Sequence, residues 1–347
     1  MYLLEDEFMS SLFKDAKRWL PGALISVVLI GAILYFVDIP KVLLAISGAN
    51  YRILALATVL AFAWMFLRAV VWRTLLRDRP SYHDTLMALG EGYLLNNILP
   101  FRLGEIGRVY MLSRKSGLPF AEILPSIFIE RAVDIAFTVG IFLASLPFIT
   151  GASGASRIGG AIGILVGIGL LSMYLLARND QWALDTFHKL SARWPTLQRL
   201  GGGILEPFLA GLIVLTDGWV FARFLFYMTL NWLLAIVNYY LIILAFYPQT
   251  QITWAMFGLG AAALGGAVPS LPGAVGTFEG AFAGALTLLT GDQSTALAVA
   301  LVSRFLNYLT SFAIGGYAFA RDGESLSAIY RELINLRAKE KPYDSTI

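Results

Sequence analysis

Two short segments, LPFRLG at residues 99–104 and LPGAVG at residues 271–276, share the pattern L-P-x-x-x-G, and each interrupts a long hydrophobic stretch. Proline and glycine end helices and form turns. The stretches that contain them, 85–118 and 252–290, are therefore each predicted to form two short helices. A helix needs about 20 apolar residues to cross the hydrocarbon core of a bilayer, and each of these arms is too short to do so. We expect both stretches to enter and leave the membrane by one face, as re-entrant helical hairpins.

The composition indicates a membrane environment. Hydrophobic residues make up 58% of the 347 positions and charged residues 14%, where a soluble domain carries about 25% charged residues. The net charge is only +3 and the basic residues are scattered, so nucleic acid is not expected as a partner. The chain has no cysteine, and His83 and His188 lie in predicted loops. We therefore expect no disulfide, no metal site and no cofactor.

Six further apolar stretches are predicted to span the membrane, which makes the fold an all-α polytopic membrane protein. They are 20–37, 51–76, 123–148, 159–176, 219–246 and 295–320. Basic residues gather at 14–18, 73–79, 178–199 and 321–341, and such groups remain in the cytoplasm. We therefore expect a multi-pass protein of the plasma (cytoplasmic) membrane with both termini cytoplasmic. Trp72 and Trp219 are expected at the membrane interfaces.

The two hairpins belong to a longer internal repeat. An acidic residue follows each L-P-x-x-x-G segment, Glu105 in the first half and Glu279 in the second. Further along, Arg131 has Asp134 at i+3, and Arg304 has Asn307 at i+3. Each half has three full spans, and because three is odd, the second copy must be inverted relative to the first. The sequence therefore predicts an inverted repeat with two oppositely oriented hairpins, an arrangement typical of transporters.

The predicted organisation has four parts. Residues 1–19 form a cytoplasmic amphipathic segment, 20–150 the first membrane repeat, 159–320 the second, and 321–347 a cytoplasmic tail. The first repeat contains the hairpin 85–118, and the second contains the hairpin 252–290. Within the second repeat, residues 180–200 are expected to form an amphipathic helix on the anionic cytoplasmic leaflet.

Charged residues inside the apolar stretches are the candidate site residues, because each costs about 2.5 to 3.5 kcal/mol at the membrane centre unless it is paired or hydrated. Glu130 and Asp134 form either a proton or substrate relay or a structural ion cluster that locks the first hairpin to its neighbouring span. Glu105 and Glu279 either complement the helix dipole or couple protons.

The arginines predict an anion site. A helix N-terminus at mid-membrane exposes unpaired amide groups, and a guanidinium matches the geometry of phosphate. Interfacial snorkelling is the alternative for Arg102 and Arg108. The predicted substrate-binding residues are Arg102, Gly104, Glu105, Arg108, Glu130, Arg131, Asp134, Pro272, Gly273, Gly276, Glu279, Arg304 and Asn307.

Three blocks of the chain resemble one known family. NNILPFRLGEIGR at 96–108, Glu130-Arg131 with Asp134, and SLPGAVGTFE at 270–279 look like the transmembrane-region family named for lysylphosphatidylglycerol synthase and flippase. The resemblance extends from about residue 20 to 320. In two-part members a cytosolic aminoacyl-transferase domain follows, whereas here only residues 321–347 remain, so the resemblance implies the lipid-translocating half. Stand-alone relatives are linked to lipid-linked or polyprenyl-phosphate intermediates.

The leading hypothesis is a lipid translocator rather than an enzyme. It would move an anionic or zwitterionic phospholipid, or a polyprenyl-phosphate-linked lipid, between leaflets by alternating access. An integral membrane enzyme that modifies a lipid head group, with Glu105, Glu130 or Glu279 as general base, is the second hypothesis; it lacks a histidine at depth and any nucleotide motif. A small-solute or ion-coupled transporter is the third. The sequence leaves proton or ion coupling and a homo-oligomer open.

Overall fold

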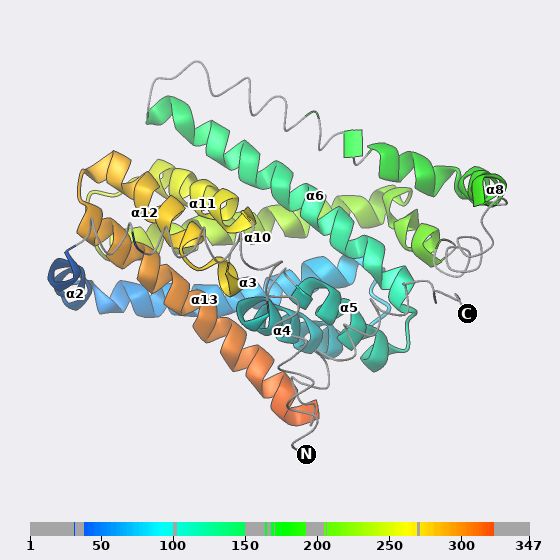
Figure 1. The fold of residues 1–347 in the computed structure, drawn as a ribbon, viewed down its shortest axis with the longest axis horizontal. Helices are drawn as coiled ribbons and strands as arrows, with labels where there is room; N and C mark the ends of the chain where they lie inside the picture. The colour runs from blue at the N-terminus through cyan, green and yellow to red at the C-terminus, as the bar shows by residue number, and fades with distance from the viewer. Residues whose placement is uncertain are drawn as a thin grey trace, which may run out of the picture.

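The computed structural model describes residues 38–99, 103–149, 171–191, 207–268 and 271–322, together with residues 31, 164, 168, 169 and 205. Within these ranges all regular structure is helical (Figure 1). Three helices are long and apolar enough to cross a membrane: α3 (Tyr51–Leu75), α10 (Gly218–Leu244) and α13 (Gln293–Asp322). They match the predicted spans 51–76, 219–246 and 295–320. Of the other predicted spans, 20–37 lies outside the described residues except for residue 31, and 159–176 lies largely outside them.

A fourth long helix, α6 (Phe120–Ser145), corresponds to the predicted span 123–148 and is followed by the short 3-10 helix η2 (Leu146–Phe148). It has 26 residues, which at 1.5 Å per residue is about 39 Å. Its length therefore suffices for a membrane. Three charged residues in its middle, Glu130, Arg131 and Asp134, make its composition less apolar than that of α3.

Each stretch that was predicted to form a hairpin contains two short helices. The first consists of α4 (Tyr82–Ile98) and α5 (Leu103–Ser116), and the second of α11 (Ile252–Ala267) and α12 (Thr277–Thr290), with the 3-10 turn η4 (Pro272–Ala274) between them. Helices of 14 to 17 residues extend about 21 to 26 Å, less than the roughly 30 Å of hydrocarbon. In each pair the two helices pack along one another.

Glycine allows this close packing. A Cβ atom on Gly104 of α5 would lie 2.0 Å from the carbonyl oxygen of Gly92 on α4. In the second hairpin, a Cβ atom on Gly265 of α11 would lie 2.6 Å from the carbonyl oxygen of Thr277 on α12. Lipid tails are as apolar as leucine, so close backbone approach of this kind, rather than exclusion of water, favours helix association in a membrane.

The helices of the two halves pack in matching pairs. The contact of α3 with α4 corresponds to that of α10 with α11, and the contact of α5 with α6 to that of α12 with α13. The first helix of each hairpin also packs against the last helix of the other half, α4 against α13 and α11 against α6. Each half is therefore completed by a helix of the other (Figure 1).

The two corresponding helices α3 and α10 lie side by side and run in opposite directions. At one end of the pair, the amide of Asn50 donates to the carbonyl of Ala245 (2.9 Å). At the opposite end, Arg77 donates to Asp217 (2.9 Å). Equivalent helices of the two halves are thus antiparallel.

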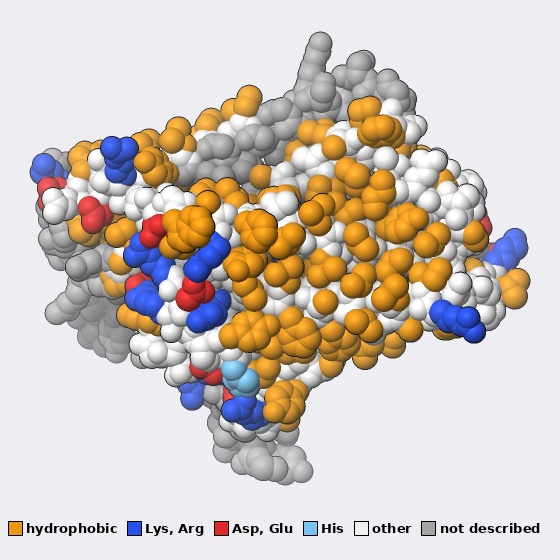
Figure 2. All heavy atoms as spheres, turned by 180° about the vertical axis from the view of Figure 1, so that it is seen from behind, with side chains coloured by type: hydrophobic (Ala, Val, Ile, Leu, Met, Phe, Trp, Pro, Cys, Tyr) orange, Lys and Arg blue, Asp and Glu red, His pale blue; other side chains and the backbone are white. Residues whose placement is uncertain are grey.

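The hairpins open toward opposite ends of the molecule. The end of α13 contacts both ends of the first hairpin, since Asp322 pairs with Lys115 of α5, and Arg321 donates to His83 of α4. Many arginines lie at this end, which we call the basic end. At the opposite end, Tyr247 packs against Trp254 at the start of α11, and its hydroxyl donates to the carbonyl of Asp292 after α12 (3.5 Å). Figure 2 shows a broad hydrophobic surface with charged side chains gathered toward its ends.

Two shorter helices complete the description. α2 (Ile39–Ser47) contacts α13, and α8 (Asp180–Ser191) falls within the predicted insert 180–200, whose remainder lies outside the described residues. On α8, Trp182 is exposed and Ala183 is buried against the body of the protein. The expectation that Trp72 lies at a membrane interface is wrong: its side chain is fully buried, and the indole donates to Ser126 (2.9 Å).

Candidate functional site

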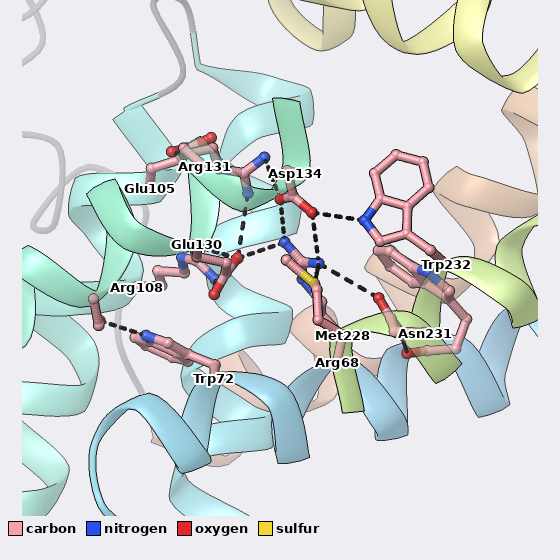
Figure 3. A network of polar contacts seen from close by, with 12 residues as sticks. Arg68, Trp72, Glu105, Arg108, Glu130, Arg131, Asp134, Met228, Asn231 and Trp232 are labelled. Carbon is pink, nitrogen blue, oxygen red and sulfur yellow. Dashed lines mark hydrogen bonds and ion pairs between the residues drawn. The ribbon is translucent and has the colours of Figure 1, made fainter. Parts of the chain in front are cut away.

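A buried network of six charged side chains joins α3, α5 and α6 near the turn of the first hairpin (Figure 3). Its members are Arg68 of α3, Glu105 and Arg108 of α5, and Glu130, Arg131 and Asp134 of α6. Three are basic and three acidic, so the charges of these six cancel. This balance explains how they are tolerated at depth, because an unpaired charge in a low-dielectric region is strongly destabilising.

Glu130 is the centre of the network. Its side chain is inaccessible and accepts hydrogen bonds from Arg68 (2.6 Å) and Arg108 (2.9 Å). Arg68 also forms a two-pronged contact with Asp134, with one bond of 3.0 Å. Both arginine side chains are only 3% exposed, so interfacial snorkelling, one expectation for Arg108, is wrong. One carboxylate therefore connects α6 to both α3 and α5.

Aromatic and amide groups enclose the network. The guanidinium of Arg108 lies over the ring of Trp72, 4.7 Å from its centroid, and α10 contributes Trp232, whose indole donates to Asp134 (3.2 Å). The side chain of Asn231, also on α10, lies within 3.4 Å of Arg68 and donates to the carbonyl of Trp64 on α3. These contacts fix the arginine orientations and tie the network to the second half of the chain.

Arg131 is the least engaged cation of the network. Its Nε lies 3.2 Å from Glu105, and its terminal nitrogens lie 3.5 Å from Asp134 and 3.6 Å from Glu130, all longer than the contacts of Arg68 (2.6 Å) and Arg108 (2.9 Å) with Glu130. Its side chain is 32% exposed, ten times the exposed fraction of Arg68. Arg131 can therefore present donors to an anion at lower cost than Arg68 or Arg108.

The second half has a simpler counterpart at its own hairpin. Arg304 of α13 donates to Glu279 of α12 (2.6 Å) and to the carbonyl oxygens of Gly273 (2.5 Å) and Ala274 (3.1 Å) in the turn. The other oxygen of Glu279 accepts from the amide of Gly276 (2.8 Å) and caps α12. Arg304 thus holds the turn in shape, and three of its donor atoms are already used.

This turn needs glycine for steric reasons. Gly273 and Gly276 both have positive φ angles, 70° and 88°, which side chains rarely tolerate. Pro272 begins the 3-10 turn, where its fixed φ is favourable. Pro272 and Gly276 of the L-P-x-x-x-G motif therefore suit the backbone path of this turn, together with Gly273, whereas Gly104, the matching glycine of the first hairpin, lies within helix α5.

The turn of the second hairpin meets the first helix of the first hairpin. η4 packs against α4, and a Cβ atom placed on Gly273 would lie 3.6 Å from the carbonyl oxygen of Asn97 near the end of α4. The same Cβ would lie 2.6 Å from the hydroxyl of Tyr308 on α13. Two segments far apart in sequence thus form one central junction.

The structure brings together most of the predicted site residues in two groups. Glu105, Arg108, Glu130, Arg131 and Asp134 form the first, next to Gly104, and Pro272, Gly273, Gly276, Glu279 and Arg304 form the second, with Asn307 one turn further along α13. Arg102 lies outside the described residues.

Sequence reasoning did not name Arg68, Trp72, Asn231 and Trp232 as site residues. Arg68 and Asn231 carried a usable signal, since a charged or amide side chain in the middle of an apolar span requires a partner. Among the described residues there is also no group of three or more histidine, aspartate or glutamate side chains that could hold a metal ion.

The long apolar helices, the paired short helices and the compensated internal charges define a polytopic helical membrane protein. More particularly, the chain belongs to the family described as the lysylphosphatidylglycerol synthase TM region, whose model matches residues 19–315. This match confirms the family expected from the three sequence blocks.

Similar proteins include two named UPF0104 membrane proteins from Methanothermobacter thermautotrophicus. One is 21% identical over 326 residues, which cover 90% of this chain and 97% of that protein; the other is 25% identical over 352 residues, covering 94% and 100%. Glycosyltransferase AglD of Haloferax volcanii is 22% identical over 355 residues, covering 92% of this chain but only 57% of that protein. No solved structure matches the chain.

Proposed function

We propose that this protein translocates a lipid with an anionic or zwitterionic head group between the leaflets of the plasma membrane. The observation that carries the proposal is the central junction, where η4 of the second hairpin packs against α4 of the first, oppositely directed hairpin. Transporters with inverted repeats bind their substrates at such midplane junctions of broken helices. The lipid tails would remain in the bilayer while the head group crosses along the junction.

The membrane topology that we propose has six spans and two re-entrant hairpins arranged as an inverted repeat. Antiparallel packing of α3 and α10 supports the inversion, and the short hairpin helices support re-entry by one face. The basic end would face the cytoplasm, since basic residues remain on that side. Both termini would then be cytoplasmic.

Arg131 is the residue that we propose to bind the head group. Arg68 already pairs with Glu130 and with Asp134, so both carboxylates keep a partner when Arg131 turns toward a phosphate. A phosphate that competes with Glu105 for Arg131 would loosen the contact between α5 and α6. Binding would thus be connected to movement of the first hairpin.

Family membership supports a lipid as the cargo, and the glycosyltransferase relative favours lipids that carry or receive sugars, including polyprenyl-phosphate-linked ones. That relative is also the specific observation in favour of a head-group-modifying enzyme. The buried acids Glu130 and Glu279, two of the proposed general bases, each bind an arginine, which withholds them from a substrate proton. We therefore prefer translocation to catalysis and to small-solute transport.

The test is reconstitution of the full chain in vesicles that contain a fluorescent phosphatidylglycerol, with a membrane-impermeant quencher used to measure the lipid in each leaflet. We expect faster equilibration than in protein-free vesicles, and a loss of at least about tenfold in Arg131→Ala, because one hydrogen-bonded charge contributes about 1.5 to 3 kcal/mol. Arg79→Ala, which removes an ion pair with Glu122 at the basic end, is the matched control and should behave as wild type. Equilibration at the protein-free rate would refute the proposal. Mass spectrometry of the same lipids would reveal an enzyme as a changed lipid species.

A further inference from the structure

A second buried carboxylate lies apart from the Arg131 network. Glu91 is in the middle of α4, its side chain is 1% exposed, and both of its oxygens lie 3.0 Å from the ammonium of Lys115 on α5. The same ammonium forms an ion pair with Asp322 at the end of α13. The three side chains connect the interior of the first hairpin to the last helix of the second half.

The charges of this triad do not balance. Two carboxylates share one ammonium, whereas the carboxylates of Glu130, Asp134 and Glu279 are each bound by at least one arginine. Arginine remains protonated in proteins, so each of these carboxylates keeps a cationic partner. Of the two acids in the triad, burial disfavours the charged form far more strongly for Glu91 than for Asp322, which is 30% exposed. Glu91 is therefore the carboxylate that accepts a proton first.

The surroundings of Glu91 offer no other charge to stabilise its ionised form. From α5 it meets Lys115, and from α13 its carboxyl group lies within hydrogen-bond reach of Asp322, which binds the same lysine; neighbouring Arg321 is directed to His83, which also lies beside Asp84. In the part of α3 that packs on α4, Arg68 and Arg73 are paired elsewhere, and η4 has no charged residue. Within the described ranges, the ionisation of Glu91 thus depends on a single shared cation.

Exposure increases stepwise from Glu91 to the basic end. The exposed side-chain fractions are 1% for Glu91, 15% for Lys115 and 30% for Asp322. A proton from solvent at this end has a short polar route to the buried carboxylate. The route is separate from the Arg131 network, because Lys115 contacts no member of that network in the described structure.

We propose that Glu91 is a proton-binding site through which the protein couples lipid movement to a proton gradient; the coupling, though not the proton site itself, rests on the proposed function. One proton from the basic end binds one carboxylate oxygen of Glu91, and the net charge of the triad changes from −1 to 0. Lys115 is then left entirely to Asp322. Protonation therefore strengthens the ion pair that joins the first hairpin to α13, and deprotonation weakens it.

The proton site is tested by infrared titration of the purified full chain in lipid nanodiscs. We expect a protonated-carboxyl band to appear between about pH 5 and pH 9, the range accessible to a buried glutamic acid. The band should be absent in Glu91→Gln, which is isosteric with the protonated form. Glu122→Gln, which removes another acid near the same end, should leave it unchanged. A wild-type protein without the band, or a band that persists in Glu91→Gln, would overturn the proposal.

Asp322→Asn provides a second test at a partly exposed position. Without the carboxylate of residue 322, Lys115 pairs with Glu91 alone. The pH at which the protonated-carboxyl band reaches half of its intensity should therefore fall by about one unit or more. An unchanged midpoint would contradict the shared-cation argument. A merely structural ion pair gives no reason for a titration that shifts in this direction.

Coupling is tested in vesicles with a pH difference across the membrane. In the wild type the rate of lipid translocation should respond to the direction of the gradient, and in Glu91→Gln it should not respond. An equal response in both proteins would overturn the coupling. If the wild type moves no lipid at all, the proposed function fails, while the infrared titration still decides whether Glu91 binds a proton.

Discussion

Replacing Gly104 by alanine should separate the two helices of the first hairpin. The new Cβ atom would lie 2.0 Å from the carbonyl oxygen of Gly92, 2.6 Å from the amide nitrogen of Asn96 and 2.7 Å from its side-chain oxygen. Two of these atoms belong to the backbone, so no side-chain rotation relieves the clash. Reaching an ordinary contact of 3.4 Å from Gly92 requires 3.4 − 2.0 = 1.4 Å of movement.

Overpacking of this kind destabilises the folded state by about 1 to 3 kcal/mol, whereas replacing glycine by alanine in a helix interior stabilises it by only about 0.5 to 1 kcal/mol. We therefore expect a net destabilisation of roughly 1 to 2 kcal/mol. The measurement is thermal unfolding in detergent, followed by tryptophan fluorescence.

The controls separate the clash from the loss of a glycine. Gly140→Ala on α6 meets no atom within 4 Å and should be neutral or stabilising. Gly265→Ala should be destabilising, because its Cβ would lie 2.4 Å from Ala281 and 2.6 Å from the backbone of Thr277. Equal stability of Gly104→Ala and wild type, or an equal loss in Gly140→Ala, would refute the close packing.

Three further predictions follow from the charges and the ends of the helices. Arg68→Met leaves Glu130 and Asp134 on α6 without their shared arginine and should lower the free energy of unfolding, measured with a chemical denaturant, by about 3 to 5 kcal/mol. An unchanged free energy of unfolding would show that these ion pairs are absent. Burial tends to raise the pKa of Asp292, but hydrogen bonds from Thr295 outweigh it and lower the pKa. Asp292 should therefore stabilise the protein relative to Asp292→Asn above the unfolded-chain pKa of about 3.9, and this advantage in melting temperature should disappear as the pH falls through the lower folded-state pKa. The chain contains no cysteine, so the variants Ser81→Cys and Ser47→Cys each carry a single thiol. A membrane-impermeant thiol reagent should label Ser81→Cys only from the cytoplasmic side and Ser47→Cys only from the outside. Labelling of both variants from the same side would contradict the topology.

Much of the fold can be read from the sequence because membrane helices have strong local signals. The apolar runs of α3, α10 and α13 predicted their bounds to within a few residues, and the two L-P-x-x-x-G segments predicted the hairpin breaks. The fixed φ angle of proline and the tolerance of glycine for positive φ angles, as at Gly273 and Gly276, are properties of the residue types themselves. Such features need no knowledge of tertiary contacts.

The partners of the charged residues could not be predicted, because they depend on which faces of distant helices meet. Arg68 and Glu130 are far apart in sequence and form the core of the network. Trp72 was expected at an interface because it lies near the end of an apolar span, yet it lies under Arg108 and is fully buried in the protein. The sequence also indicated arginines free to hold an anion, whereas Arg304 is occupied by its own turn.

In the proposed mechanism, the two antiparallel halves open alternately around the central junction. Spin-label distances test it most directly, with one pair across the halves at the basic end, Ser81→Cys with Ala222→Cys, and one at the opposite end, Ser47→Cys with Gln293→Cys. Reconstituted protein that translocates lipid should show reciprocal changes, one distance distribution widening as the other narrows when the lipid composition or pH is changed. Distances that stay fixed at both ends, or that change in the same sense, while lipid still moves would contradict the claim.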